Sequence, residues 1–383
     1  NMVARFKMLL EEFPSTPVNE DYLARLDYLS RNRNLTQNET RQLMKAVGYK
    51  SWDSVVSMLK DKGAFKDKKS AIPYWLGFYD KQSPNRTGNI YGIVMINILR
   101  EGQIVPEFFQ DLKKLNTTFM PESYLYADGD ITIKMLLSQN PNLTTEQIDF
   151  FCYPQRGILN PINMKSTILA RVSKLNNRQF ELFLENKNKN LSRNAYLTPE
   201  QVDKLWFYKD YENQLKFSRS NILRACKLTD EQFLRGFRTI NGLRQSVFIR
   251  RLIANYQLTK SQSAQLFDLR KGNSDDKEQF EYNINNLAKR QHLSSENFNF
   301  LLNYKPQSKV YKMSVNNKLT VDQINSLYFL PYGDTDYDDL AQFSKLTDEQ
   351  FLVLFNSKDV DNNYLAENPY FPSFQYGMFN WKW

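Results

Sequence analysis

The chain has 383 residues, with 51 Lys and Arg against 42 Asp and Glu, which gives a formal net charge of +9. A hydrophobic share of 41% excludes a disordered chain, and only 13 glycines argue against Gly-rich loops and turn-dense β-sandwiches. A chain of this length is expected to divide into domains, and we predict a helical module over 1–66, a mixed segment over 67–133, a helical repeat domain over 134–360 and an aromatic C-terminal cap over 361–383.

The N-terminal module carries a pattern typical of two short helices joined by a tight turn. A capped run from Thr36 to Val47 is followed by a turn at Gly48 and a second run from Trp52 to Leu59. This order resembles a helix-turn-helix of the winged type, which implies that the start of the second helix reads DNA. A purely structural unit of three helices fits the same pattern. The residues at the start of the second helix are Lys50, Ser51, Trp52 and Ser54.

The mixed segment has the weakest helical pattern in the chain. Residues 71–79 and 89–96 flank a good turn sequence, so they are candidates for a small β-hairpin. Further on, Asp128-Gly129 is a turn signal before it is a metal site. We therefore expect a hairpin, a wing or an insertion in this segment, and no metal.

A short string that begins a helix recurs nine times along the chain. It reads Leu, then Thr, Ser or Asn, then two further residues, then Gln, Glu or Asn. The polar side chain at the second position accepts a bond from the N3 amide, and the side chain at N3 reaches back to the cap, which makes a capping box. We predict a helix start at every copy. The first residues of the nine copies are Leu35, Leu143, Leu175, Leu197, Leu228, Leu258, Leu293, Leu319 and Leu346.

The copies from Leu143 to Leu346 follow one another at spacings of 22 to 35 residues, and a second amphipathic run stands between several of them. Two helices per unit at such a period are expected of a helical solenoid. The segment 136–147 resembles the HEAT-like family called leucine-rich-repeat variants, which implies stacked helix pairs over roughly 130–360. We expect a mostly α-helical fold of irregular two-helix repeats, either an α-solenoid or a helical bundle.

The excess positive charge is concentrated in one segment. Between Gln201 and Gly272 fourteen basic residues oppose six acidic ones, a net charge of +8, whereas residues 334–383 carry −6. Arginine dominates the basic segment and suits bidentate phosphate contacts. If the helices stack, these arginines form one wall that attracts a polyanion. The predicted nucleic-acid-binding residues of the wall are Arg219, Arg224, Arg235, Arg238, Arg244, Arg250 and Arg251.

Other interpretations of the charge pattern remain open. An acidic protein partner, or the chain's own acidic C-terminal part, would pair with the same basic face. The segment is otherwise a solvated basic face that binds no partner. The acidic tracts 334–339 and 359–363 lack the glycine and glutamate of a calcium loop, so we predict that both are solvated linkers and not metal sites.

Cysteine and histidine are scarce, which limits the available chemistry. Cys152 and Cys226 cannot build a disulfide framework or a structural zinc site, so we expect the buried, reduced thiols of a cytoplasmic protein. The one histidine, His292, excludes two-histidine metal motifs, and we expect it to be a packing residue. The longest apolar run, 90–99, is too short to span a bilayer. We predict no catalytic residue, no cofactor, no metal and no membrane partner.

These observations predict a non-enzymatic nucleic-acid-binding protein, with DNA favoured over RNA as its partner, that acts in transcription regulation or genome handling. The high share of Asn, Lys, Phe and Tyr is typical of an AT-rich genome and favours a phage or low-GC bacterial origin. The alternative is a protein-interaction scaffold or virion component that uses a solenoid groove. The third hypothesis is an enzyme, a DNA glycosylase built from helical repeats.

Overall fold

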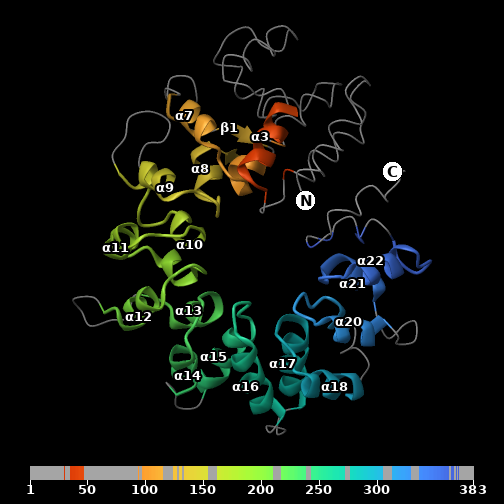
Figure 1. Cartoon of the computed structure of the whole chain (residues 1–383). Helices are drawn as coiled ribbons and strands as arrows, with labels where there is room; N and C mark the ends of the chain where they lie inside the picture. The colour runs from red at the N-terminus through yellow and green to blue at the C-terminus, as the bar shows by residue number, and fades with distance from the viewer. Residues whose placement is uncertain are drawn as a thin grey trace, which may run out of the picture. The chain divides into compact units, whose positions relative to one another are not determined.

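The computed structural model describes part of the chain. The described residues are 30, 35–46, 94, 97–114, 124–126, 129–131, 133–153, 162–209, 217–238, 243–271, 277–304, 313–328, 336–361, 364–365, 368 and 370. They are mostly helical, as the sequence predicts (Figure 1). They belong to two compact units, one ending at Leu191 and the other beginning at Ser192. The division falls inside the predicted repeat domain.

A helix starts at each of the nine predicted strings, and we call these nine the capped helices. They are α3 (Gln37–Ala46), α9 (Thr145–Cys152), α11 (Asn177–Glu185), α12 (Pro199–Phe207), α14 (Asp230–Arg238), α16 (Lys260–Lys271), α18 (Ser295–Asn303), α20 (Val321–Tyr328) and α22 (Asp348–Phe355). The other elements are α7 (Pro106–Lys114), α8 (Ile133–Ser138), α10 (Leu169–Val172), the 3-10 helix η1 (Lys189–Arg193), α13 (Arg219–Ala225), α15 (Leu243–Ile253), α17 (Lys277–Arg290) and α21 (Tyr337–Phe343).

Eight of the nine caps form the complete capping box. In each of them the cap side chain accepts from the N3 amide and the N3 side chain accepts from the cap amide, over 2.8 to 3.3 Å. The exception is the cap of α18, where Ser294 accepts from the Asn297 amide but Asn297 Oδ1 is buried without a partner. Asparagine is one methylene shorter than the glutamine found at most N3 positions, which accounts for the missing bond.

We expect Asn297→Gln to raise the free energy of unfolding by about 1 kcal/mol, because the longer side chain completes the box and gives a buried oxygen its donor. Urea denaturation followed by circular dichroism measures the change. The control is Asn303→Gln, since Asn303 is exposed near the end of the same helix. A loss of stability in the Asn297 variant would contradict this account of the cap.

The residues on both sides of the caps pack into the core. The leucine before the cap is buried in eight copies, and Leu346 is half-buried. The residue at N4 is buried in all nine. Two of those N4 residues are polar, Thr40 and Ser263, and each hydroxyl donates to the carbonyl oxygen of its own cap residue, Thr36 or Thr259. That bond lets a polar side chain take an apolar position.

The glutamine at N3 also joins five of the capped helices, α11, α14, α16, α20 and α22, to the capped helix before them. In the second unit, Gln232 Nε2 donates to the Pro199 carbonyl and to Asp203 of α12, both over 2.9 Å. Gln350 makes the equivalent bonds to Val321 and Asn325 of α20. In the first unit, Gln179 does the same with Thr145 and Asp149 of α9. One side chain therefore fixes both a helix start and its neighbour.

Buried asparagines make a second, parallel set of bonds. Asn255 Nδ2 donates to the carbonyls of Leu223 and Cys226, at the end of α13, and its Oδ1 accepts from the Gln257 amide. The same three bonds recur at Asn140, Asn188, Asn316 and Asn368. The helices that stand between the capped helices, which we call the intervening helices, are thus tied together as the capped helices are. In the second unit α13 contacts α15 and α15 contacts α17.

The remaining predicted elements have mixed outcomes. The described sheet is an antiparallel pair, β1 (Tyr124–Tyr126) and β2 (Gly129–Ile131). Gly129 of the predicted Asp-Gly turn is the first residue of β2, and Asp128 lies outside the described residues. Within the hairpin predicted over 71–96, Val94 is helical, contrary to that prediction, and the rest lies outside the described residues. The linker predicted at 334–339 is wrong at its end, because Asp336 caps α21 through the Asp339 amide.

Candidate nucleic-acid interface

The basic segment divides its charges between two kinds of helix. The intervening helices α13 and α15 together contain five arginines and no acidic residue. The acidic residues of the described part of the segment lie on the capped helices α12, α14 and α16. The way the capped helices begin accounts for this division. Carboxylates stabilise the N-terminal turn of a helix. In addition, Asp203 and Asp230 accept from glutamines at the N3 positions of the following capped helices.

The helices α13 and α15 pack side by side, which brings their arginines onto neighbouring elements (Figure 1). Arg224 of α13 and Arg250 of α15 are exposed, and Arg251 is half-buried. The Arg250 guanidinium lies 6.0 Å from the centre of the Tyr282 ring of α17. Among the described residues, no carboxylate forms an ion pair with Arg224 or Arg251. These three arginines, which we call the arginine face, form the candidate surface for an anionic ligand.

Two other predicted arginines gather at the C-terminal end of α12, on aromatic rings. The guanidinium of Arg219 lies 4.9 Å from the Trp206 ring, and its Nε donates to the Trp206 carbonyl over 3.3 Å. The guanidinium of Arg235 lies 4.8 Å from the Phe207 ring. Such cation–π contacts orient a guanidinium while leaving its other edge accessible. Burial, and secondly the charge on Arg235, lower the pKa of Arg219 below the usual arginine value.

Arg235 is already engaged by the protein's own carboxylates. Its Nη1 lies 2.7 Å from Asp203 Oδ1, and its Nη2 lies 3.6 Å from Glu231 Oε1. Asp203 also accepts from Gln232, the N3 glutamine of α14. Phosphate binding at Arg235 would have to compete with these bonds, so Arg235 belongs to the packing of α12 against α14 more than to the arginine face.

The other sequence-predicted site residues are only partly placed. Arg238 lies at the end of α14 and Arg244 near the start of α15, and their side chains lie outside the described parts. The four residues of the helix-turn-helix hypothesis, Lys50, Ser51, Trp52 and Ser54, also lie outside the described residues, although the first helix of that pattern is present as α3.

The aromatic partners of these arginines were not predicted from the sequence. Trp206 and Phe207 stand next to each other at the end of α12, and one is buried whereas the other is 57% exposed. An exposed aromatic directly after a buried one, at the end of an amphipathic helix, was the available signal. It does not reveal which arginine covers the ring, because Arg219 and Arg235 come from two later helices.

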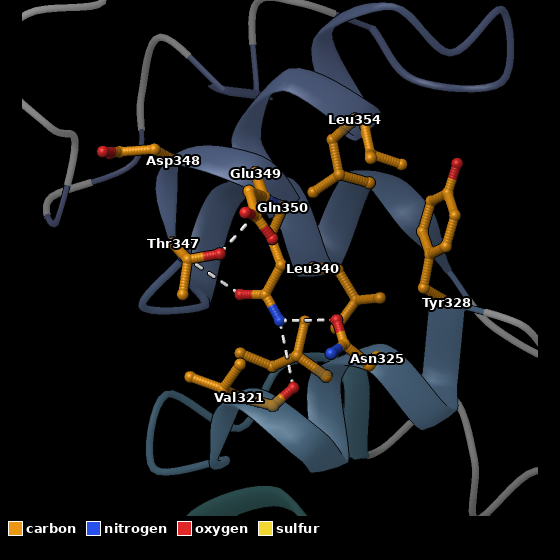
Figure 2. A pocket seen from close by; sticks show the side chains of 11 residues that line it. Val321, Asn325, Tyr328, Leu340, Thr347, Asp348, Glu349, Gln350 and Leu354 are labelled. Atoms are coloured by element: carbon orange, nitrogen blue, oxygen red, sulfur yellow. Dashed lines mark hydrogen bonds between the residues drawn. The ribbon is translucent and has the colours of Figure 1, made fainter.

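A groove of about 690 Å³ lies between α20 and α22 at the C-terminal end of the second unit (Figure 2). Its walls are mainly apolar, and Val321 and Val353 are 46% and 44% exposed. Gln350 lines the groove, but Thr347, Val321 and Asn325 already use its amide, as Figure 2 shows. The exposed carboxylates of Asp348 and Glu349 also line the groove. Such a surface suits an apolar, basic peptide better than a phosphate.

The reactive residue types are packed rather than poised for chemistry. Cys152 and Cys226 are free and buried, as predicted, and burial raises the pKa of each thiol to about 12. His292 is half-buried, and its pKa is lowered by burial and then by three lysines. Nowhere in the described ranges do three or more His, Cys, Asp or Glu side chains meet as a metal site requires. None of the described helices has the length and hydropathy needed to cross a bilayer.

Comparison with known proteins adds no relative to this picture. No family model, no curated protein and no solved structure matches the chain.

Proposed function

We propose that this protein is a non-enzymatic nucleic-acid-binding protein that holds DNA, in preference to RNA, on the arginine face of a stacked two-helix repeat domain, and that it acts in transcription regulation or genome handling. The observation that carries the proposal is the pair of adjacent helices α13 and α15, which contain five arginines and no carboxylate. The proposed contacts are made by Arg224, Arg250 and Arg251, with Arg219 at the margin.

The physical argument is one of local charge. Desolvating guanidinium groups against a neutral or basic partner is unfavourable, whereas a polyphosphate releases its condensed counterions when cations replace them. Arginine adds bidentate geometry toward phosphate oxygens. Three of the acidic residues on neighbouring helices already have partners, because Asp203 and Asp230 accept from glutamines and Asp203 and Glu231 pair with Arg235. These three carboxylates therefore oppose the field of α13 and α15 only weakly.

The test is the charge reversal Arg224/Arg250/Arg251→Glu, with binding to a labelled DNA duplex measured by fluorescence anisotropy over a range of salt. We expect affinity to fall at least about tenfold, and the slope of log K against log salt to decrease by about 0.9 for each phosphate that the variant no longer neutralises. The matched control is Lys165/Lys189/Lys358→Glu, which changes the net charge equally at exposed positions outside α13 and α15.

Two outcomes would refute this assignment. If the two triple variants lose affinity equally, binding depends on net charge and not on the arginine face. If the parent chain shows no salt-sensitive DNA binding, the proposal fails altogether.

A second candidate function is supported by the apolar groove between α20 and α22. Exposed valines beside Asp348 and Glu349 favour a protein-interaction scaffold that captures a basic, apolar segment. The test is Val353→Asp, which places a charge in the apolar groove. If the variant no longer associates with a co-purifying partner or with itself, and the parent chain does not bind DNA, this function is favoured over the first.

A further inference from the structure

Buried amides tie successive loops of the second unit to one another in two groups. The first group contains residues 255–257, 290–292 and 316–318, and the second contains residues 344–346, 368 and 370. The exposed Asn317 donates to the Tyr370 hydroxyl and so joins the two groups. Gln291 donates to the carbonyls of Ile253 and Asn255, and Asn316 donates to those of Ala288 and Gln291. Asn368 donates to Ala341 and Ser344. The exposed residues of these loops therefore have fixed neighbours, and we call them, together with Lys260 at the start of α16, the loop edge.

Cations gather on the loop edge around the single histidine. Lys260, Lys318 and Lys345 are each close enough to His292 to disfavour its protonation, although burial is the larger cause of its lowered pKa. Lys318 Nζ donates to the Tyr256 carbonyl over 2.6 Å, and burial lowers the pKa of Lys318 to about 8. Three lysines and an imidazole thus share one small region of the surface.

Two exposed tyrosines are interleaved with these cations. Tyr256 is 60% exposed, and the Arg290 guanidinium lies 5.7 Å from its ring centre. Tyr370 is 39% exposed, Lys345 Nζ lies 4.9 Å from its ring centre, and its hydroxyl accepts from an exposed asparagine, Asn317. The rings are oriented by their neighbours and remain accessible to a ligand.

In the part of the chain that the structure describes, ion pairs do not compensate the positive charge of the loop edge. Within the described residues, no carboxylate forms an ion pair with Lys260, Arg290, Lys318 or Lys345. Arg290 Nε is, in addition, buried without an acceptor. Cations brought together without counter-charges repel one another, so an anion that binds among them stabilises the arrangement.

We propose that the loop edge is a binding site for single-stranded nucleic acid, in which phosphates contact Lys260, Arg290 and Lys345 and bases stack on Tyr256 and Tyr370; this rests on the proposed nucleic-acid-binding function. The cations are spread over successive loops, which suits several linked phosphates better than one isolated anion. Exposed tyrosine rings add nothing toward a duplex, whose bases are stacked on one another, but they stack well on unpaired bases. The alternating rings and cations therefore favour a single strand.

The test compares a labelled thymidine oligonucleotide with a labelled duplex in fluorescence anisotropy. For Tyr256/Tyr370→Ala we expect single-strand affinity to fall roughly tenfold or more, since each stacked base contributes about 1–3 kcal/mol, with duplex affinity unchanged. Tyr256/Tyr370→Phe should keep single-strand binding, because stacking needs only the ring. The control is Tyr196/Tyr364→Ala, which removes two tyrosines that are 45% and 37% exposed elsewhere in the unit.

Each result bears on one proposal. Unchanged single-strand affinity in the alanine variant, with duplex binding intact, would overturn the loop-edge site and leave the arginine face standing. An equal loss for both ligands, or an equal loss in the control variant, would also overturn base stacking at these tyrosines. A parent chain that binds neither ligand would remove the proposed function itself.

Discussion

Replacing Asn255 with leucine is expected to lower the free energy of unfolding by about 4 kcal/mol. The side chain is fully buried and makes three hydrogen bonds, to the carbonyls of Leu223 and Cys226 and from the Gln257 amide, over 2.7 to 2.9 Å. Leucine has a similar volume but leaves all three backbone groups without this partner. Each buried group left unpaired costs about 1–3 kcal/mol, so the loss is large even if the loops relax in part.

Urea denaturation followed by circular dichroism measures this loss, and Asn303→Leu is the matched control. Asn303 is exposed, and its amide donates only to the carbonyl four residues earlier in α18. We expect the control to change stability by less than about 0.5 kcal/mol. Equal losses of stability in the two variants would show that the buried asparagines do not hold the intervening helices together.

The sequence predicts the capping boxes, but not the bonds by which the same side chains join one helix to the next. A capping box is formed by residues within one turn, so the pattern Thr-x-x-Gln predicts it directly. The sequence does not reveal that the same glutamine also bonds to the preceding capped helix, because Gln232 donates to groups 29 and 33 residues away. Asparagine three positions before the leucine is equally regular, at Asn140, Asn255 and Asn316, but its partners are also distant.

The candidate site was predictable in its net charge but not in its layout. Counting charges over a segment treats Arg224 and Arg235 alike, yet Asp203, which lies 32 residues before Arg235, pairs with one and not with the other. The loop edge has no counterpart in any sequence window, because Tyr256 and Tyr370 are separated by more than a hundred positions. Only the stacking of successive helices brings such residues together.

Gly236→Val is expected to lower the free energy of unfolding by about 3 kcal/mol, through crowding rather than through the removal of a hydrogen bond. Gly236 of α14 is buried against α13 and α15, and an added Cβ would lie 2.9 Å from Leu223 Cδ2 and 3.6 Å from Leu252 Cδ1. Both leucines are fully buried, so their side-chain ends can shift enough for one methyl group but not for the two additional methyl groups of valine. Overpacking a close-packed core of this kind costs about 1–3 kcal/mol, and valine gains little helix propensity over glycine.

Gly236→Ala is the matched control for this crowding. Its single methyl meets the flexible end of Leu223, and the gain in helix propensity of about 1 kcal/mol offsets the contact, so stability should change by less than about 1 kcal/mol. Leu223 and Leu252 stand next to Arg224 and Arg251, so the valine variant should also weaken DNA binding below its melting temperature, whereas the alanine variant should not. If the valine and alanine variants have the same stability and the same affinity for DNA, the close packing of α14 on these helices does not position the arginine face.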